Sequence, residues 1–392
     1  MKKITITGLV GSLVLVGALV RPPAGEGSSF TFESPVPPVG TPGGTETQLS
    51  GAPLAQWLRG RVIFDRDFHH TAGLGTPDFN ADSCRACHAD PGLGGAGGLE
   101  LNVARFGQDM GSGFVDLAGG QAASKLRPPV MEGDFEPREE MPPLANVYEQ
   151  RQTPSILGDG LLDDIAESVI LANQDPTDAN ADGIFGVARI VSVGGGQTAV
   201  GRFGWKAQIP SLLDFAHDAV TGEIGLTVPD NGRGFGALTD LDTVADPEIT
   251  NDDLADLVFF MRNLAAPRRK NSQDPAVAEG EMLFTSVGCA KCHLPSLQGP
   301  NGPVRAYTNL LLHNVQSATF SGMAEPGAGS GMYRTPPLWG ISETGPWWHD
   351  GRGETLFDTI YLHEGEATAV TAAFDALTES QKMALLAFLN DL

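Results

Sequence analysis

The cysteines of this chain all belong to two copies of one short pattern, Cys-x-x-Cys-His. The copies are Cys84, Cys87 and His88 in the first, and Cys289, Cys292 and His293 in the second, and together they use the 4 cysteines of the sequence. Two thiols at this spacing can bond to the two vinyl groups of one porphyrin, and the adjacent histidine can then bind its iron. The sequence therefore predicts two covalently attached haem c groups. Zinc binding or disulfide formation is the alternative that the spacing leaves open.

The composition indicates an acidic, loop-rich protein. Lys+Arg 25 against Asp+Glu 48 gives a formal net charge of −23 at pH 7, and Gly 50 and Pro 28 predict many loops. This charge argues against nucleic acid or an anionic membrane as a partner. It suits a basic electron-transfer protein, and we expect a small carrier such as a cytochrome c or a cupredoxin as partner.

The N-terminus carries an export pattern. Two lysines precede an apolar run that ends at Val20, so residues 1–20 are predicted to be a signal peptide or an uncleaved N-terminal anchor that tethers the protein to a membrane. Residues 21–50 are rich in Pro, Gly, Ser and Thr, which predicts a flexible linker. Haem c is attached outside the cytoplasm, so we expect a periplasmic or otherwise exported protein.

Helical patterns recur in the same order around the two motifs. Residues 54–64 and 276–284 each place a glycine four residues before a phenylalanine, ahead of a haem motif. Residues 250–264 align without gaps on residues 378–392, and each stretch has a threonine N-cap followed by apolar residues at helical spacing. The repeats indicate two copies of one haem-binding unit.

These repeats predict the domain organisation. We expect an N-terminal c-type haem domain at 51–265 and a C-terminal one at 266–392, with a linker at 267–272. The expected fold class is all-α and loop-rich, with two cytochrome c-like haem domains that meet at an interface.

Four further segments carry a family resemblance. They are Gly201–Ala207 (GRFGWKA), Arg334–Gly340 (RTPPLWG), His349–Arg352 (HDGR) and His363–Ala367 (HEGEA). With both haem motifs, they make the chain resemble the di-haem cytochrome c peroxidase superfamily. Within it, the chain is most similar to the di-haem oxidoreductases, also described as putative peroxidases or thiol oxidoreductase-like proteins. This resemblance implies an oxidoreductase with two haem groups.

The resemblance also assigns an axial ligand. Relatives place the sixth ligand of the second haem fourteen residues after the histidine of a His-Asp-Gly segment, and counting from His349 reaches His363. A haem bound by His293 and His363 would be low-spin, closed to substrate and suited to electron transfer.

The internal repeat breaks the symmetry between the two haems. When Phe203–Trp205 is laid on Trp347–His349, the position that matches His363 is Ala219, which cannot bind iron. In classical relatives a different histidine caps the first haem, but that position falls near Gln150 here. The His88 haem is therefore predicted to be open, or capped by an unexpected group, and to be the site of chemistry.

Several residues near this open face are candidates for catalysis or haem contact. Glu223 lies close to the place of the family's distal glutamate and could transfer a proton, and His217 is a second acid–base candidate. Phe215 stands where relatives have a glutamine, which departs from the classical peroxidase pattern. Trp205 aligns with a tryptophan that lies between the haems of relatives, and Arg352 is a candidate partner of a haem propionate. His69, His70 and His313 are interpreted as loop or structural histidines.

Calcium binding is a further prediction. One loop alternates oxygen-bearing side chains as the start of a calcium loop does, but its twelfth position is an arginine rather than a glutamate. A second candidate comes from the resemblance, which implies an inter-haem calcium bound near a Thr-x-Pro. The candidate ligands are Asp178, Asn180 and Asp182 in the first loop, and Thr344 and Pro346 in the second.

The sequence favours an exported di-haem oxidoreductase that reduces peroxide at the N-terminal haem with electrons delivered through the C-terminal haem. One alternative is an oxidase or oxygenase acting on a thiol, a protein side chain or a polymer. The other is a non-catalytic di-haem electron carrier.

Overall fold

A computed structural model of the chain describes residues 35–75, 79–110, 114–115, 143–240, 242–320 and 322–392. The predicted signal at 1–20 and the first part of the predicted linker lie outside these residues. In the described part, no helix has the length and apolar character needed to cross a membrane. Residues 35–50 run along the rest of the chain: Thr45 forms a β-bridge with Leu264, and the amide of Ala266 donates to Glu46 at 2.9 Å.

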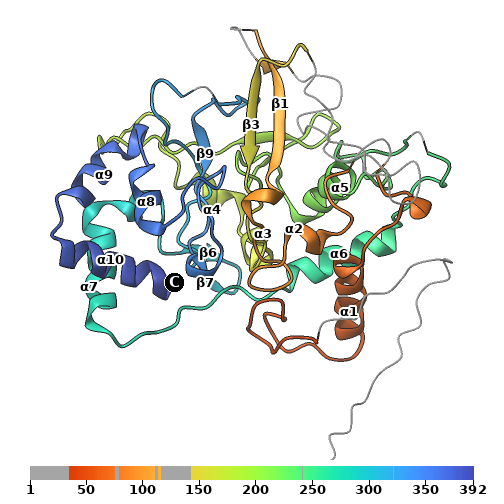
Figure 1. The fold of residues 1–392 in the computed structure, drawn as a ribbon, viewed down its shortest axis with the longest axis horizontal. Coiled ribbons are helices and arrows are strands. Elements are labelled where there is room, and N and C mark those ends of the chain that lie inside the picture. Colours follow the sequence, from red (N-terminus) through yellow and green to blue (C-terminus); the bar gives the residue numbers. More distant parts are fainter. Residues whose placement is uncertain (1–34, 76–78, 111–113, 116–142, 241, 321) are drawn as a thin grey trace, which may run out of the picture.

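Helices form most of the regular structure (Figure 1). They are α1 (Gly51–Asp65), α2 (Cys84–Cys87), α3 (Asp159–Asp163), α4 (Glu167–Leu171), α5 (Leu212–Glu223), α6 (Asn251–Arg262), α7 (Pro275–Val287), α8 (Leu356–Tyr361), α9 (Thr368–Asp375) and α10 (Glu379–Asp391). The four helical stretches expected from the sequence appear as α1, α7, α6 and α10. The first haem motif forms α2, and the second begins with a 3₁₀ turn at Cys289–Lys291.

Two helix pairs cross in the same manner, α1 with α6 and α7 with α10. A Cβ atom on Gly60 would lie 1.9 Å from the carbonyl oxygen of Asp256, and one on Gly280 would lie 2.0 Å from that of Ala384. Only glycine lets the backbones approach this closely. Phenylalanine pairs then close each crossing, with ring centroids 5.1 Å apart for Phe64 and Phe260.

The C-terminal partners of these pairs begin with the same cap. Thr250 and Thr378 each accept the amide of the third helical residue, and the side chain of that residue, Asp253 or Gln381, accepts the amide of the threonine. This capping box satisfies two amides that the first helical turn leaves without partners. The threonine N-caps predicted from the sequence are confirmed.

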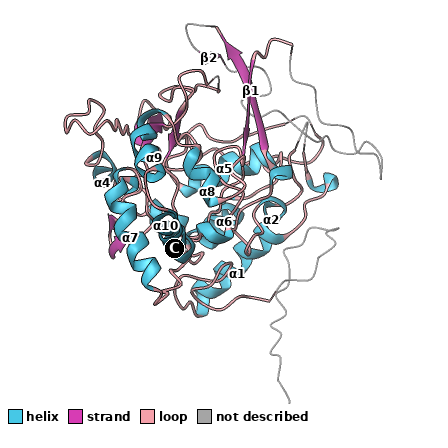
Figure 2. Cartoon of the chain, turned by 60° about the vertical axis from the view of Figure 1, so that its left-hand side comes forward, coloured by secondary structure: helices cyan, strands magenta, loops and turns pink. Residues whose placement is uncertain are grey.

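Strands form four small antiparallel sheets, so the all-α prediction is too narrow (Figure 2). The strands are β1 (Val103–Asp109), β2 (Phe114–Val115), β3 (Val147–Arg151), β4 (Ile190–Ser192), β5 (Thr198–Val200), β6 (Leu297–Gly299), β7 (Gly302–Val304), β8 (Leu312–Asn314) and β9 (Met332–Arg334). The structure is 34% helical and 13% strand. Most strands have two or three residues, too few for the alternation that identifies a strand in a sequence.

Buried charges tie the segment before the 267–272 linker to the segment after it. Glu325 pairs with Arg151 and Arg189 at 2.8 Å each, and its carboxylate is almost fully buried. Lys206 is fully buried, and its Nζ donates to three carbonyl oxygens, those of Gly329, Ser330 and Met332 at 2.9–3.0 Å. We call residues 325–332 the anchored loop, because three cations from the earlier segment hold it in place.

Candidate haem-binding cavity

One cavity reaches both Cys-x-x-Cys-His motifs. It contains about 2720 Å³ of space free of protein atoms, counting its solvent-open mouth, and Cys84, Cys87, Cys289 and Cys292 all line it. All four cysteines lie in the described part of the chain, and no disulfide joins them. Most of the lining is apolar, as a porphyrin requires.

The three predicted ligand histidines have the same local arrangement. Nδ1 of His88 lies 3.0 Å from the Gly95 carbonyl oxygen, and Nδ1 of His293 lies 3.0 Å from that of Tyr307. Nδ1 of His363 lies 2.9 Å from the carbonyl oxygen of Thr359. A carbonyl can only accept, so each ring carries its proton on Nδ1 and leaves Nε2 available for iron.

Burial keeps these rings neutral, which is the form that binds a metal. It lowers the pKa of His88 and of His363, and burial together with the nearby His363 lowers the pKa of His293 to about 3. The cavity, the thiol pairs and the neutral imidazoles together fit two haem groups.

The two halves differ at the sixth-ligand position. His363, just after α8, and Ala219, on α5, both line the cavity, as the internal register predicts. A histidine near Gln150 is absent from the sequence, and Gln150 itself donates to the Tyr148 hydroxyl at 3.1 Å and does not line the cavity. The cavity therefore has a ligand side chain at the second motif where it has a methyl group at the first.

One face of α5 forms the cavity wall at Ala219. Phe215, Asp218, Ala219 and Glu223 are spaced by three or four residues along the helix, and all line the cavity. Of these, Asp218 carries a charge that the sequence analysis overlooked. Glu223 lies at the cavity as predicted, and the Asn80 side-chain amide donates to its carboxylate.

Asp218 lies in a mixed electrostatic environment. Burial raises the pKa of its carboxyl, the charge of Arg105 lowers it, and the carboxylates of Glu223 and Glu325 raise it further. Arg105, on β1, also lines the cavity. Asp218 is thus a carboxyl at the cavity whose pKa is raised above the ordinary aspartate value, against the opposing charge of Arg105.

The other histidine candidates lie away from the cavity. His217 is buried on α5, its Nε2 is 3.3 Å from the Asn231 amide nitrogen, and it is not among the lining residues. His69 and His70 stack on each other with ring centroids 3.9 Å apart and do not line the cavity either. The structure does not bring any of the three to the predicted site.

His313 does line the cavity, but both of its ring nitrogens have partners. Nδ1 lies 3.1 Å from the Glu366 carboxylate, and Nε2 lies 2.9 Å from the Asn309 amide. These contacts agree with a structural role for this histidine.

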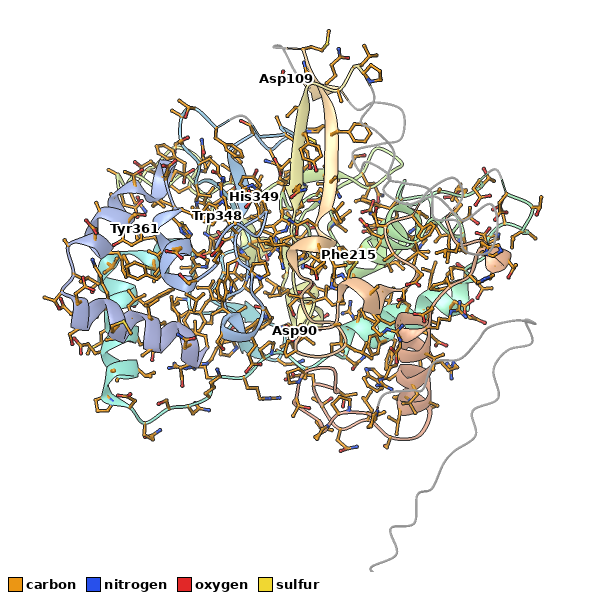
Figure 3. All side chains as sticks on the ribbon, viewed as in Figure 1. Asp90, Asp109, Phe215, Trp348, His349 and Tyr361 are labelled. Atoms are coloured by element: carbon orange, nitrogen blue, oxygen red, sulfur yellow. The ribbon has the colours of Figure 1, made fainter. Side chains whose placement is uncertain are left out.

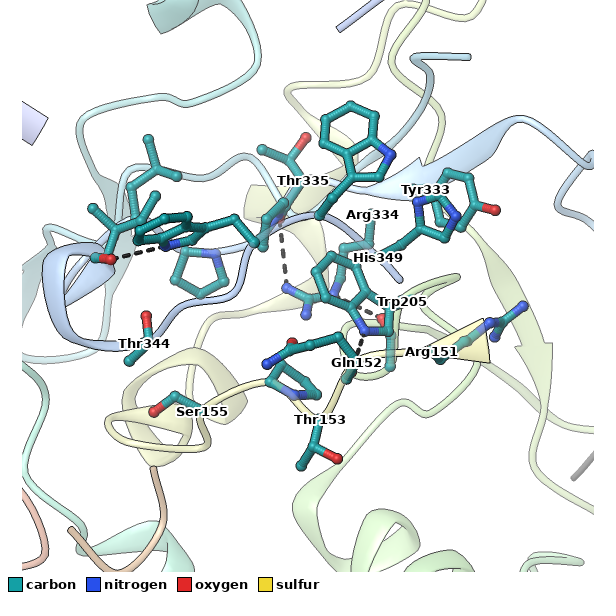
Figure 4. Close-up of a pocket in the computed structure, with 18 of the residues that line it drawn as sticks. Arg151, Gln152, Thr153, Ser155, Trp205, Tyr333, Arg334, Thr335, Thr344 and His349 are labelled. Carbon is teal, nitrogen blue, oxygen red and sulfur yellow. Dashed lines mark hydrogen bonds between the residues drawn. The ribbon is translucent and has the colours of Figure 1, made fainter. Parts of the chain in front are cut away.

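Trp205 lies where the two segments of the chain meet (Figure 4). Its indole N–H donates to the Gln152 carbonyl at 2.7 Å, and its own carbonyl accepts the amide of Arg334 at 2.7 Å. It lines the same cavity as both haem motifs. The side chain is therefore held at a fixed place beside both predicted haem sites.

A chain of rings leads away from the predicted ligand His363. Trp348 lies edge-on to it with centroids 4.7 Å apart, and His349 follows at 6.0 Å from Trp348. Tyr333 stacks on His349 at 3.9 Å. Figure 3 labels Trp348 and His349 side by side at the centre of the molecule, and these rings were not recognised from sequence.

Arg352, the predicted propionate partner, does not line the cavity. Its guanidinium donates to Gln316 at 3.0 Å and lies 3.6 Å from Asp350. Arg334 lines the cavity instead, fully enclosed, and burial lowers its pKa to about 10. Asp159, also at the cavity, has a pKa raised to about 7 by burial against the opposing effect of Arg334.

The two candidate calcium sites differ in their surroundings: the first lies in a self-bonded loop and the second at the cavity. The carboxylate of Asp178 accepts the amides of Asp182 and Gly183, and Asp182 pairs with Lys291 at 3.3 Å, so these oxygens serve the loop's own backbone and a cation. Thr344 and Pro346 lie at the cavity.

Within the described residues, a different carboxylate cluster has metal-binding spacing. Asp240, Asp246 and Glu248 present oxygens within 4.8 Å of one another.

Comparison with known proteins places this arrangement in a family. The sequence model of the family described as "Di-haem oxidoreductase, putative peroxidase" matches residues 146–392. The chain belongs to this family. The family match includes α5, Trp205, the second motif and His363, and it begins after the first motif. Membership supports a di-haem oxidoreductase and implies haem as its cofactor.

Solved structures give two further similarities. A MauG-like protein associated with microbial copper homeostasis is 21% identical over 36% of this chain and 52% of its own length, with a TM-score of 0.27. Hydrazine synthase of Kuenenia stuttgartiensis is 15% identical over 94% of this chain and 100% of its own, with a TM-score of 0.37. This chain thus spans about half the length of the MauG-like protein. A search of curated proteins found no match.

Proposed function

We propose that this protein is an exported enzyme that reduces peroxide at the haem held by Cys84, Cys87 and His88. Electrons enter through the haem held by Cys289, Cys292, His293 and His363. In both cases the two cysteines form thioether bonds to the porphyrin. The observation that supports the proposal is the contrast within one cavity, which is lined by His363 and, at the matching position of the first half of the chain, by Ala219.

The chain's own residues divide the work between the two sites. When bound, each haem supplies a redox-active iron, and an iron with a free coordination position can bind peroxide. The hydrogen bonds of Gly95 and Tyr307 hold the proximal imidazoles in fixed orientations. His363 closes the second site to substrate, and the small side chain of Ala219 leaves room for peroxide at the first.

The contacts of Trp205 support electron transfer between the sites. The indole N–H is held by the Gln152 carbonyl and the Trp205 backbone carbonyl by the Arg334 amide, so the ring has a fixed place at the cavity, and a fixed aromatic ring loses little energy to reorganisation when it relays an electron. The apolar lining excludes water and strengthens the electrostatic effect of the few charged groups at the cavity.

Electron paramagnetic resonance of the ferric protein tests this proposal. We expect one high-spin signal from the open haem beside one low-spin signal from the bis-histidine haem, and the high-spin signal should convert on addition of cyanide. Two low-spin signals with no response to cyanide or peroxide would instead indicate a pure electron carrier.

Turnover of peroxide with reduced cytochrome c is the second measurement. A protein with the high-spin signal that fails to oxidise reduced cytochrome c in the presence of peroxide would contradict peroxide reduction and favour oxidation of another substrate at the same open haem.

A further inference from the structure

The cavity wall formed by α5 contains a carboxyl side chain, that of Asp218. Asp218 occupies the position directly before Ala219, and the matching position before His363 is Leu362. In the second half of the chain the predicted ligand His363 is preceded by an apolar leucine. In the first half, Ala219 is preceded by a residue with a carboxyl group. Asp218 lies within α5, and Leu362 follows directly after the end of α8.

We propose that Asp218 is the residue that transfers a proton between the two oxygens of peroxide at the open side of the first haem. The proposal rests on the function proposed above and adds the identity of its acid–base group. Asp218 lies three residues after Phe215 and five before Glu223, on the α5 face that lines the cavity.

The two carboxylates differ in how they are held. Glu223 accepts a hydrogen bond from the Asn80 side chain, and its backbone carbonyl accepts the amide of Asn80 at 2.7 Å, so both ends of this residue are tied to one loop. Asp218 has charged neighbours on three elements: Arg105 on β1, Glu223 on α5 and Glu325 on the anchored loop.

These neighbours suit a group that gains and loses a proton. Burial and the two glutamates favour the protonated form of Asp218, and Arg105 favours the charged form. The carboxylate takes the proton from the inner oxygen of H₂O₂ and delivers it to the outer oxygen. The O–O bond breaks, its electron pair leaves with the outer oxygen, and that oxygen departs as water. Two electrons from a reduced one-electron carrier and two protons from solvent convert the inner oxygen to the second water.

Cyanide binding tests the assignment without turnover. Hydrogen cyanide must lose a proton to bind iron as the anion, so its binding rate reports the same base, and stopped-flow absorbance measures it on the full-length ferric holoprotein. We expect Asp218→Asn to lower the rates with cyanide and with peroxide by about 10²-fold or more. Asp218→Glu should recover much of the loss. Leu213→Asn, on the exposed face of α5, is the control for an added amide and should keep the original rate.

The pH profile separates a proton carrier from a structural side chain. In the original protein the rate should fall as pH drops through the pKa of Asp218, because the protonated acid cannot accept a proton. Glu223→Gln removes a charge that raises this pKa, so the midpoint should move to lower pH. Arg105→Gln removes a charge that lowers it, so the midpoint should move to higher pH.

Two results would overturn the assignment in distinguishable ways. If Asp218→Asn keeps the original rates and acid limb while the unmodified protein binds cyanide, Asp218 is not the proton carrier and the proposed function stands. If the unmodified protein does not bind cyanide at all, the proposed function fails and the assignment fails with it.

Discussion

At the scale of single residues, the difference between the two haem sites depends on one side chain. His363 and Ala219 occupy matching positions at one cavity, and the surrounding helices place both of them there. A histidine at position 219 would line the cavity at the position that matches His363. In the proposed function, the open site is therefore a consequence of a missing ligand rather than of a different fold.

Ala219→His should close the first site. We expect the high-spin signal of the ferric protein to be replaced by a second low-spin signal, and the cyanide response to be lost, because an added imidazole can reach the iron as His363 does. Ala219→Leu is the matched control, since it adds similar bulk without a ligand atom and should retain a high-spin signal. A histidine variant that remains high-spin would show that α5 does not face the iron.

Sequence patterns predicted the haem ligands but not the charged groups around them. His88 and His293 follow from the motif and His363 from a fixed count, because covalent spacing is local in the sequence. Asp218 has no motif, and its environment depends on Arg105 and Glu325, which are distant in sequence. Arg352 was predicted as a propionate partner from its motif and does not line the cavity, whereas Arg334 is an arginine that packing brings there.

At the scale of elements, helix pairs frame the cavity. α1 crosses α6, and α7 crosses α10, each at a glycine with no room for a Cβ atom. These helices were predictable because their caps, glycines and phenylalanines recur at fixed spacing. The short strands could not be predicted in this way, because β4 to β9 each contain only three residues.

Gly60→Ala and Gly280→Ala should each destabilise the protein by about 1–3 kcal/mol, because the new methyl group meets backbone that cannot move cheaply. Thermal unfolding, followed by the circular dichroism of the helices at about 222 nm, measures the effect. Gly222→Ala on α5 is the matched control, since no atom lies within 4 Å of its added Cβ, and it should be neutral or slightly stabilising. Equal melting temperatures for all three variants would contradict the close crossings.

At the scale of the whole molecule, buried charges connect the two segments of the chain. The anchored loop contributes Glu325, and the arginines beside it hold its pKa at about 2 although burial alone would raise it. The folded-state pKa lies below the ordinary value of 4.5, so this carboxylate stabilises the fold above pH 4.5 and loses that contribution as pH falls toward 2.

Glu325→Gln should therefore cost about 3–5 kcal/mol at neutral pH, because it leaves Arg189 buried without its carboxylate partner and leaves Arg151 paired with Glu149 alone. The difference in melting temperature from the original protein should narrow as pH falls from 4.5 toward 2. Glu354→Gln, at an exposed position, is the control and should melt with the original protein at each pH. A difference that stays constant with pH would contradict the assigned ionisation.

The net charge of −23 has a kinetic consequence for the proposed electron donor. Turnover with a basic cytochrome c should slow as ionic strength rises from about 0.01 M to about 0.1 M, because the screening length falls from roughly 30 Å to roughly 10 Å. An acidic carrier should show the opposite trend or no trend in the same steady-state assay. Salt-independent turnover with the basic carrier would contradict electrostatic steering.

The anchored loop also determines whether the two segments of the chain separate after proteolytic cleavage. A cut within residues 267–272 breaks the one covalent connection between the two segments but leaves Lys206 inside its three carbonyls and Glu325 between its two arginines. The nicked protein should therefore migrate as one species in size-exclusion chromatography and separate into two fragments only under denaturing conditions.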